Sequence, residues 1–292
     1  MRSMLFLPAD SEKKLAKGEN SGADGLILDL EDSIAPARKD EGRRLARQYL
    51  DLRPPATRTQ KLMVRINPLD GEMTLDDLSA VVGGAPDYII MPKYRTREDV
   101  IRLDHYLSAL EVREGVEPGY IKILVIGTET GQGLLNLGGL TDCSTRLSYV
   151  SWGEFDLSAD VGAETHRLPD GSWDDLFRTA RSLCLAAAAS AAIEPCNTVF
   201  TDFKDEPGLQ QACEGARRAG FTCMMAIHPN QVDTINKAFS ITEEQLDWSK
   251  RVVEAFDANP DVGVVGLDGI MLDKPHYNQA KRMMQRAALY DA

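Results

Sequence analysis

The sequence has no long hydrophobic run and no cluster of basic residues. No apolar stretch approaches the roughly 18 residues that a membrane-spanning helix requires. Only a four-residue apolar run precedes Pro8, which is too short for a signal peptide. We therefore expect a cytoplasmic protein that makes no membrane contact.

Positive charge is also scarce, because 33 basic residues stand against 45 acidic ones and the net charge is −12. Binding to nucleic acid or to anionic membranes needs clustered Lys and Arg, so the sequence argues against both. An anionic substrate would have to be neutralised locally, by a few placed cations or by a metal ion.

Cysteine and histidine are too few and too scattered to form a familiar metal site. The five cysteines never form CxxC, and the four histidines show neither HxH nor HExxH spacing. An odd number of cysteines without a motif predicts buried free thiols in a reducing compartment. This pattern argues against both a zinc site and a disulfide framework.

Short apolar runs of strand length recur along the chain and alternate with polar, helix-like stretches. Continuous apolar strands between helices predict a parallel sheet covered on both faces. Eight such units in residues 1–227 predict a closed (β/α)8 barrel, with an open doubly wound sheet as the alternative. No GxGxxG follows the first run, which argues against a dinucleotide-binding version of that alternative. The runs lie at 4–7, 25–30, 62–66, 87–91, 121–126, 147–152, 191–195 and 222–227.

Residues 228–292 remain after the eighth run and predict a C-terminal extension. A helix through 246–258, a glycine-punctuated extended segment at 262–275 and a final helix are expected there. Such an arm would bury its apolar residues either as a lid or against a neighbouring subunit.

Acidic residues follow several predicted strands at the end where barrel active sites form. Glu129 and Asp156 follow consecutive strands and would face one mouth, where two carboxylates suit Mg²⁺. Two loop acids without a ligand are the alternative. The stretch "GLILDLEDS" adds Asp29, Glu31 and Asp32, whose mutual repulsion a nearby cation would relieve.

Two basic residues also end predicted strands. Arg65 closes an apolar run, a costly position without an anionic partner, and its planar fork suits a carboxylate or an enolate oxygen. A salt bridge from Arg65 to Asp29 or Glu31 is the alternative and does not exclude binding of substrate. Lys93 is more simply explained as an ion pair at the barrel rim.

Seven motifs, in this order, resemble the citrate lyase β-subunit-like (CitE-like) branch of the HpcH/HpaI aldolase family, which includes malyl-CoA and citramalyl-CoA lyases. The resemblance covers essentially the whole chain. The motifs are "RSMLFLPADSEKKLAK", "SGADGLILDLEDSIAPARKDEGR", "VRINPLDG", "GTETGQGLLN", "WGEFDLSADVGA", "GFTCMMAIHPNQV" and "LDGIMLDKPHYNQAKRM".

The resemblance implies a (β/α)8 barrel assembled as homotrimers or hexamers, with Mg²⁺ as cofactor. It implies cleavage or formation of a carbon–carbon bond in a 3-hydroxyacyl-CoA such as malyl-, citramalyl- or citryl-CoA. Glu129 and Asp156 match the metal ligands, and Arg65 matches a catalytic, substrate-binding arginine. Asp273 matches the catalytic carboxylate that the C-terminal segment donates across a subunit boundary.

Positions that line the acyl-CoA site in the family are matched by Phe6, Lys13, Ile227 and His228. Three departures from the family pattern concern the same region. Ala9-Asp10 replaces the usual Gly after the first proline, and Phe6 stands where some relatives carry Tyr. In Glu154-Phe155-Asp156 the Glu is one residue further from the ligand Asp than usual.

Three other functions stay open on the sequence. The same metal and carboxylates could direct water onto a thioester, which would make the protein an acyl-CoA thioesterase. The chain could instead present acyl groups as the β subunit of a larger citrate lyase complex. Cleavage of a free 2-keto-3-hydroxy acid is the third, and Phe6, Lys13 and the C-terminal arm argue mildly against it.

Overall fold

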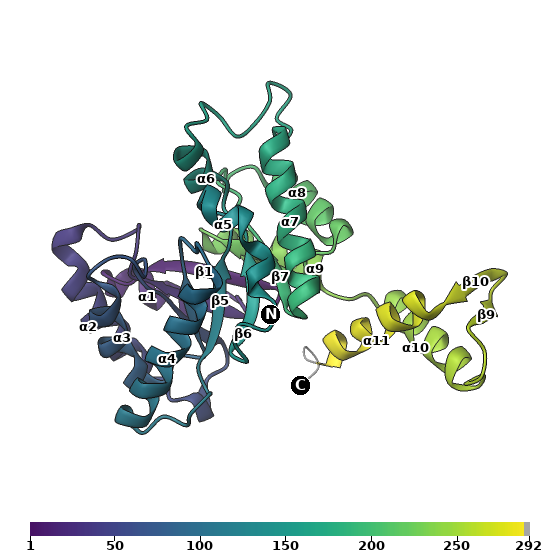
Figure 1. Cartoon of the computed structure of the whole chain (residues 1–292), viewed down its shortest axis with the longest axis horizontal. Helices are drawn as coiled ribbons and strands as arrows, with labels where there is room; N and C mark the ends of the chain where they lie inside the picture. Colours follow the sequence, from purple (N-terminus) through teal and green to yellow (C-terminus); the bar gives the residue numbers. More distant parts are fainter. Residues whose placement is uncertain (289–292) are drawn as a thin grey trace. The chain divides into compact units, whose positions relative to one another are not determined.

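The computed structural model describes residues 1–288 and divides into two compact units (Figure 1). The first unit is Met1–Phe239 and the second is Ser240–Ala292. We expected the boundary at 227/228, but the division falls after helix α9 (Val232–Phe239). This helix belongs with the barrel because it contacts both β1 and β8.

Within residues 1–288, the first unit contains a closed barrel of eight parallel strands, which confirms the predicted fold and rules out an open sheet. The barrel closes where β1 pairs with β8 in the register Met4 to Met225. The strands are β1 (Ser3–Pro8), β2 (Gly25–Asp29), β3 (Lys61–Arg65), β4 (Tyr88–Met91), β5 (Lys122–Ile126), β6 (Leu147–Ser151), β7 (Glu194–Asn197) and β8 (Cys223–Ala226).

Helices follow the strands and form the outer layer of the first unit (Figure 1). The α-helices there are α1 (Glu12–Glu19), α2 (Lys39–Asp51), α3 (Thr74–Val81), α4 (Arg97–Glu114), α5 (Gly131–Leu135), α6 (Glu154–Val161), α7 (Asp175–Ala191), α8 (Glu206–Ala219) and α9. Short 3-10 turns lie at Pro36–Arg38, Pro55–Thr57, Val82–Gly84, Leu137–Leu140 and Pro229–Gln231.

The strands are apolar on both faces because each face meets a different core. Met4, Ile27 and Met63 belong to the cluster inside the barrel. Their chain neighbours Leu5 and Leu26 belong to the cluster between the strands and the helices. Side chains alternate across a strand, so a strand buried on both sides reads as a continuous hydrophobic run.

The seventh strand lies further along the chain than the sequence predicted. We expected it at 191–195, but α7 runs through Ala191 and ends with Ala192 in a left-handed conformation. The alanine-rich stretch favours helix, because alanine has the highest helix propensity. The strand begins only at Glu194 and continues to Asn197.

Gly133 allows the loop after β5 to pack against the loop after β4. A Cβ atom at this position would lie 2.9 Å from the carbonyl oxygen of Gly127 and closer still to that of Tyr94.

We expect Gly133→Ala to lower the free energy of unfolding by about 2 kcal/mol, as overpacking typically does. Gly138→Ala is the matched control, because nothing lies within 4 Å of its Cβ position. Urea unfolding of both variants tests this, and equal stabilities would contradict the assignment.

The second unit contains α10 (Glu243–Asp257), the antiparallel hairpin β9 (Val264–Leu267) and β10 (Ile270–Asp273), and α11 (Lys274–Ala288). Its small core includes Val252, Phe256 and Leu272. The hairpin leaves Ile270 and Met271 more than half exposed. The expected order of helix, extended arm and helix is therefore present.

Two expectations from composition can be checked in the described residues. The five cysteines are free and buried, as the sequence predicted. Across residues 1–288, none of the helices has the length and apolar character needed to span a membrane.

Candidate active site at the carboxyl ends of the strands

Charged residues from four successive β/α units meet at the carboxyl ends of the barrel strands. Arg65 ends β3, Lys93 follows β4, Glu129 follows β5 and Asp156 lies in the first turn of α6. Parallel strands in a barrel deliver their following loops to one rim, which is why residues far apart in sequence come together here.

Glu129 is a buried carboxylate, with only 4% of its surface exposed. Its Oε2 accepts a hydrogen bond from the backbone N–H of Lys93 at 2.5 Å. Burial, together with the negative charges of Asp156 and Glu31, raises the pKa of Glu129 to about 8. A cation at this position would relieve both effects, because it favours the ionised form of the carboxylate.

Asp156 lies near Glu129 and is linked to the same lysine. Its Oδ1 is 3.6 Å from Lys93 Nζ, and its side chain is about one third exposed. Glu154, in the same turn, is instead buried and contacts Thr198. The helix therefore presents Asp156, and not Glu154, toward Glu129.

Arg65 is held by the acidic stretch that follows β2. Its Nε and Nη2 donate to the two oxygens of Asp29, each at 2.7 Å, and its Nη1 lies 2.8 Å from Glu31 Oε2. Burial disfavours the ionised form of Asp29, but the hydrogen bonds and charge of Arg65 outweigh it and lower the pKa of that carboxyl. The predicted salt bridge is present, and it fixes the plane of the guanidinium beside the Phe6 ring, 4.8 Å away.

Lys39 holds the backbone of this acidic stretch in place through hydrogen bonds. Its buried Nζ donates to the carbonyl oxygens of Leu30 and Glu31 and to Oδ1 of Asn67, at 2.7 to 2.8 Å. These bonds fix the backbone from which Glu31 reaches Arg65. A lysine seven residues beyond the end of the acidic cluster carries no sequence signal of this role.

Glu154 is buried without full compensation, because its Oε2 has no hydrogen-bond partner among the described residues. Burial raises the pKa of Glu154 to about 7, and a hydrogen bond with Thr198 opposes this only in part. The unfolded chain then loses its proton at lower pH than the native protein does. Stability should therefore fall as pH rises from about 4.5 to 7, and the cost should be complete above pH 7.

We expect Glu154→Gln to stabilise the protein by up to about 3 kcal/mol at pH 8, because an amide cannot ionise. The gain should shrink at pH 5, where the native carboxyl is already neutral. Urea unfolding of the wild type and the variant at both pH values measures this. A stability difference that does not change with pH would contradict the assignment.

Of the residues predicted to line an acyl-CoA site, Phe6 lies on β1 and its ring contacts Arg65. Lys13 is exposed on α1. Ile227 and His228 follow β8, where both backbone N–H groups donate to Oε1 of Gln231. The ring of His228 stacks on Phe203 with centroids 4.7 Å apart.

Asp273 ends β10 in the second unit. Its carboxylate lies 2.6 Å from Nδ1 of His276, and half of its side chain is exposed. Asp273 and His276 both belong to the second unit.

The donor set of the cluster fits a hard cation that keeps water ligands. In residues 1–288, no group of three or more His, Cys, Asp or Glu side chains is arranged to hold a metal ion. Zn²⁺ sites usually have three or four protein ligands. Mg²⁺ instead is commonly bound through one or two carboxylates, with water and substrate oxygens completing the shell. Glu129 and Asp156 meet that requirement.

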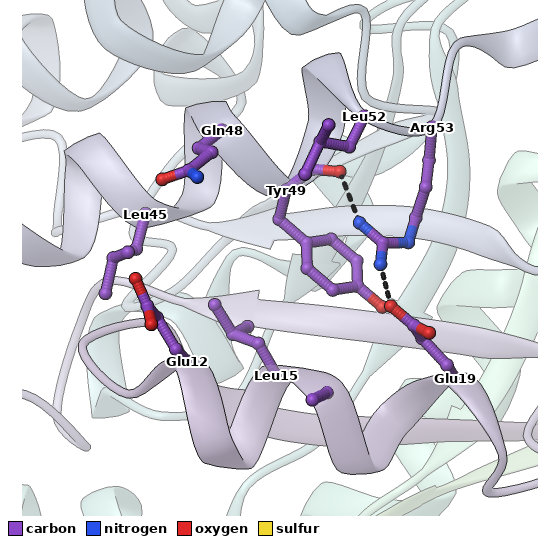
Figure 2. Close-up of a pocket in the computed structure, with 9 residues that line it drawn as sticks. Glu12, Leu15, Glu19, Leu45, Gln48, Tyr49, Leu52 and Arg53 are labelled. Carbon is purple, nitrogen blue, oxygen red and sulfur yellow. Dashed lines mark hydrogen bonds and ion pairs between the residues drawn. The ribbon is translucent and has the colours of Figure 1, made fainter.

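A pocket of about 140 Å³ lies elsewhere, between α1 and α2 (Figure 2). Leu15, Leu45 and Tyr49 form part of its wall, and the predicted site residues do not line it. Arg53 lies over the Tyr49 ring, donates to the Tyr49 carbonyl oxygen and pairs with Glu19. These contacts satisfy Arg53 within the protein, and we assign no ligand to this pocket.

The sequence matches the model of the HpcH/HpaI aldolase/citrate lyase family over residues 2–229. The chain belongs to this family. It is 34% identical to the citrate lyase subunit beta of Escherichia coli (strain K12), over 99% of this chain and 93% of that protein. It is 29% identical to a (3S)-malyl-CoA thioesterase of Cereibacter sphaeroides, over 98% of this chain and 94% of that protein.

Solved structures of the family extend the similarity to the second unit. CitE from Mycobacterium tuberculosis, crystallised with magnesium, acetoacetate and coenzyme A, matches with a TM-score of 0.76 and 30% identity, over 99% of this chain and all of that one. A citrate lyase beta subunit of the same organism, crystallised with oxaloacetate and magnesium, matches with a TM-score of 0.69 and 30% identity, over 82% and 97% of the two chains. Members of this family are lyases or related enzymes that act on CoA esters.

Proposed function

We propose that the protein is a Mg²⁺-dependent carbon–carbon lyase that acts on a 3-hydroxyacyl-CoA. The observation that carries the proposal is the convergence of a buried Glu129, Asp156 and the fixed guanidinium of Arg65 at one barrel mouth. Relatives crystallised with magnesium, oxaloacetate, acetoacetate and coenzyme A support the metal and the substrate class.

Glu129 and Asp156 would hold the metal ion. When bound, Mg²⁺ would polarise the hydroxyl and carboxylate oxygens of the acyl group. Arg65 has donors left after its bonds with Asp29, and it would stabilise the negative charge that develops on the thioester oxygen. Asp29 and Glu31 keep that guanidinium oriented before substrate arrives, so little reorganisation is required during the reaction.

Asp273 would accept the proton of the substrate hydroxyl. Loss of that proton drives formation of a carbonyl group and cleavage of the adjacent carbon–carbon bond, and the electron pair passes to the enolate of acetyl-CoA. The proton taken up by Asp273, returned directly or through water, would then protonate the enolate carbon and complete the products, acetyl-CoA and a keto acid. A carboxylate suits the role of general base.

We further propose that the hairpin β9–β10 packs on a neighbouring subunit in a homotrimer. Val264, Ile270 and Met271 are between 47% and 74% exposed, although they lie in a short hairpin with a small core behind it. Exposed apolar side chains gathered in one element mark an interaction surface. Packing of this hairpin on a second barrel would bring Asp273 of one subunit to the metal of another.

Product analysis tests the proposed reaction. The purified protein is incubated with malyl-, citramalyl- and citryl-CoA, with Mg²⁺ or with a chelator, and the products are identified by mass spectrometry. We expect acetyl-CoA together with glyoxylate, pyruvate or oxaloacetate, in the presence of Mg²⁺ only. Failure to cleave any of the three thioesters would contradict the proposal. Activity that appears only after an acyl-carrier partner is added would instead favour a subunit of a larger complex.

Thioester hydrolysis is the second candidate, and the relative named (3S)-malyl-CoA thioesterase favours it. The same residues would then direct water onto the thioester carbonyl carbon. The same experiment distinguishes the two reactions, because hydrolysis releases free coenzyme A and a hydroxy acid without acetyl-CoA.

A further inference from the structure

Lys93 contacts both the acidic residues that follow β2 and Asp156, which follows β6. Its Nζ donates to Glu31 Oε1 at 2.7 Å, and it lies 3.3 Å from Asp32 Oδ2 and 3.6 Å from Asp156 Oδ1. Glu31 is buried, whereas Asp32 is more than half exposed. The ammonium group therefore lies between the acids that follow β2 and a predicted ligand of the metal.

The backbone of Lys93 reaches the other predicted ligand. Its φ angle is 51°, in the left-handed region that residues other than glycine rarely adopt. In this conformation its N–H donates to Glu129 Oε2 at 2.5 Å. One residue thus contacts Glu129 through its backbone and Asp156 through its side chain.

Arg65 does not neutralise Asp156, because its guanidinium is paired with other carboxylates. The guanidinium of Arg65 is bound by both oxygens of Asp29 and by Glu31. In the contacts described for Asp156, the basic partner is Lys93. A divalent ion bound to Asp156 would share that carboxylate with the ammonium group, and two cations on one carboxylate repel each other.

We propose that Lys93 is a positioning residue that balances the charge of the metal site and sets its affinity for Mg²⁺. Without the metal, the ammonium compensates the carboxylates around it. A bound Mg²⁺ would share the Asp156 carboxylate with the ammonium group, which would keep its contacts with Glu31 and Asp32. Because the ammonium group repels the metal ion, Mg²⁺ would bind more weakly than it would without Lys93. The inference rests on the proposed metal site at Glu129 and Asp156.

Calorimetric titration of the full-length protein with MgCl2, at low ionic strength and without substrate, tests the proposal. We expect Lys93→Met to bind Mg²⁺ about tenfold more tightly than the wild type, because a repelling charge is removed. Lys93→Arg keeps the charge and should stay close to the wild type. Without the metal, Lys93→Met should melt at a lower temperature, because its carboxylates are no longer compensated.

Lys61→Met is the matched control, since Lys61 pairs with Asp87 at the start of β3, at the other end of the barrel. Its affinity for Mg²⁺ should equal that of the wild type. Unchanged or weaker binding by Lys93→Met, with the wild type binding normally, would overturn this inference alone. No binding by the wild type would overturn the proposed metal site, and this inference with it.

A measurement on the wild-type protein covers the case in which Lys93→Met does not fold. The ammonium signals of lysines labelled with ¹⁵N at Nζ are followed by NMR during the same titration, and Lys93→Arg identifies the signal of Lys93. We expect this signal to move with the dissociation constant found by calorimetry. A signal that does not respond to Mg²⁺ would contradict the proposal.

Discussion

Glu129→Gln is expected to weaken Mg²⁺ binding by at least about 100-fold and to reduce turnover by about 1000-fold or more, because it removes one of the two proposed carboxylate ligands. Its side chain keeps the shape of glutamate, so the loop after β5 should keep its path. Calorimetry with MgCl2 and an assay of acetyl-CoA release measure the two effects.

The stability of the metal-free variant separates loss of a ligand from loss of the fold. Burial and neighbouring negative charges raise the pKa of Glu129 to about 8, so its ionised form is unfavourable without a cation. Glutamine avoids that cost, and metal-free Glu129→Gln should be at least as stable as the wild type above pH 8. Glu117→Gln is the control, because Glu117 is exposed in the loop before β5. Normal Mg²⁺ binding by Glu129→Gln would refute its role as a ligand.

Asp273→Asn is expected to reduce kcat by about 1000-fold or more while leaving the affinity for Mg²⁺ unchanged, because it removes the proposed base but no proposed metal ligand. Asp268→Asn is the matched control in the turn of the same hairpin, where Asp268 pairs with Arg251. Its activity should stay near that of the wild type. Activity retained by Asp273→Asn would contradict the assignment.

Mixing two inactive variants tests whether Asp273 acts across a subunit boundary. In mixed oligomers of Glu129→Gln and Asp273→Asn, an intact site needs the barrel of one variant and the hairpin of the other. Random assembly from equal amounts should restore about a quarter of wild-type activity. If each hairpin instead supplied Asp273 to the barrel of its own subunit, every site would contain one of the two substitutions and the mixture would stay inactive.

The barrel could be predicted from sequence because its strands are buried on both faces and read as continuous apolar runs. The seventh strand was misplaced because helix propensity in the alanine-rich end of α7 outweighed a short apolar pattern. The unit boundary was placed too early because nothing in the sequence of α9 indicates that it packs on β1 and β8.

The position of Glu129 and Asp156 at one rim followed from their place after consecutive strands. The ion pair of Lys93 at the barrel rim could also be predicted. Its backbone contact with Glu129 could not, because that contact depends on a left-handed conformation that this residue type seldom adopts. The burial of Glu154 was equally hidden, since two acids in one helical turn differ only in the direction of their side chains.

The most direct test of the account is a crystal structure of the protein soaked with Mn²⁺, a hard cation that substitutes for Mg²⁺ and gives an anomalous signal. We predict an anomalous peak within direct coordination distance of carboxylate oxygens of both Glu129 and Asp156. Well-ordered density for both side chains without a peak between them, under conditions in which the protein is active, would contradict the account.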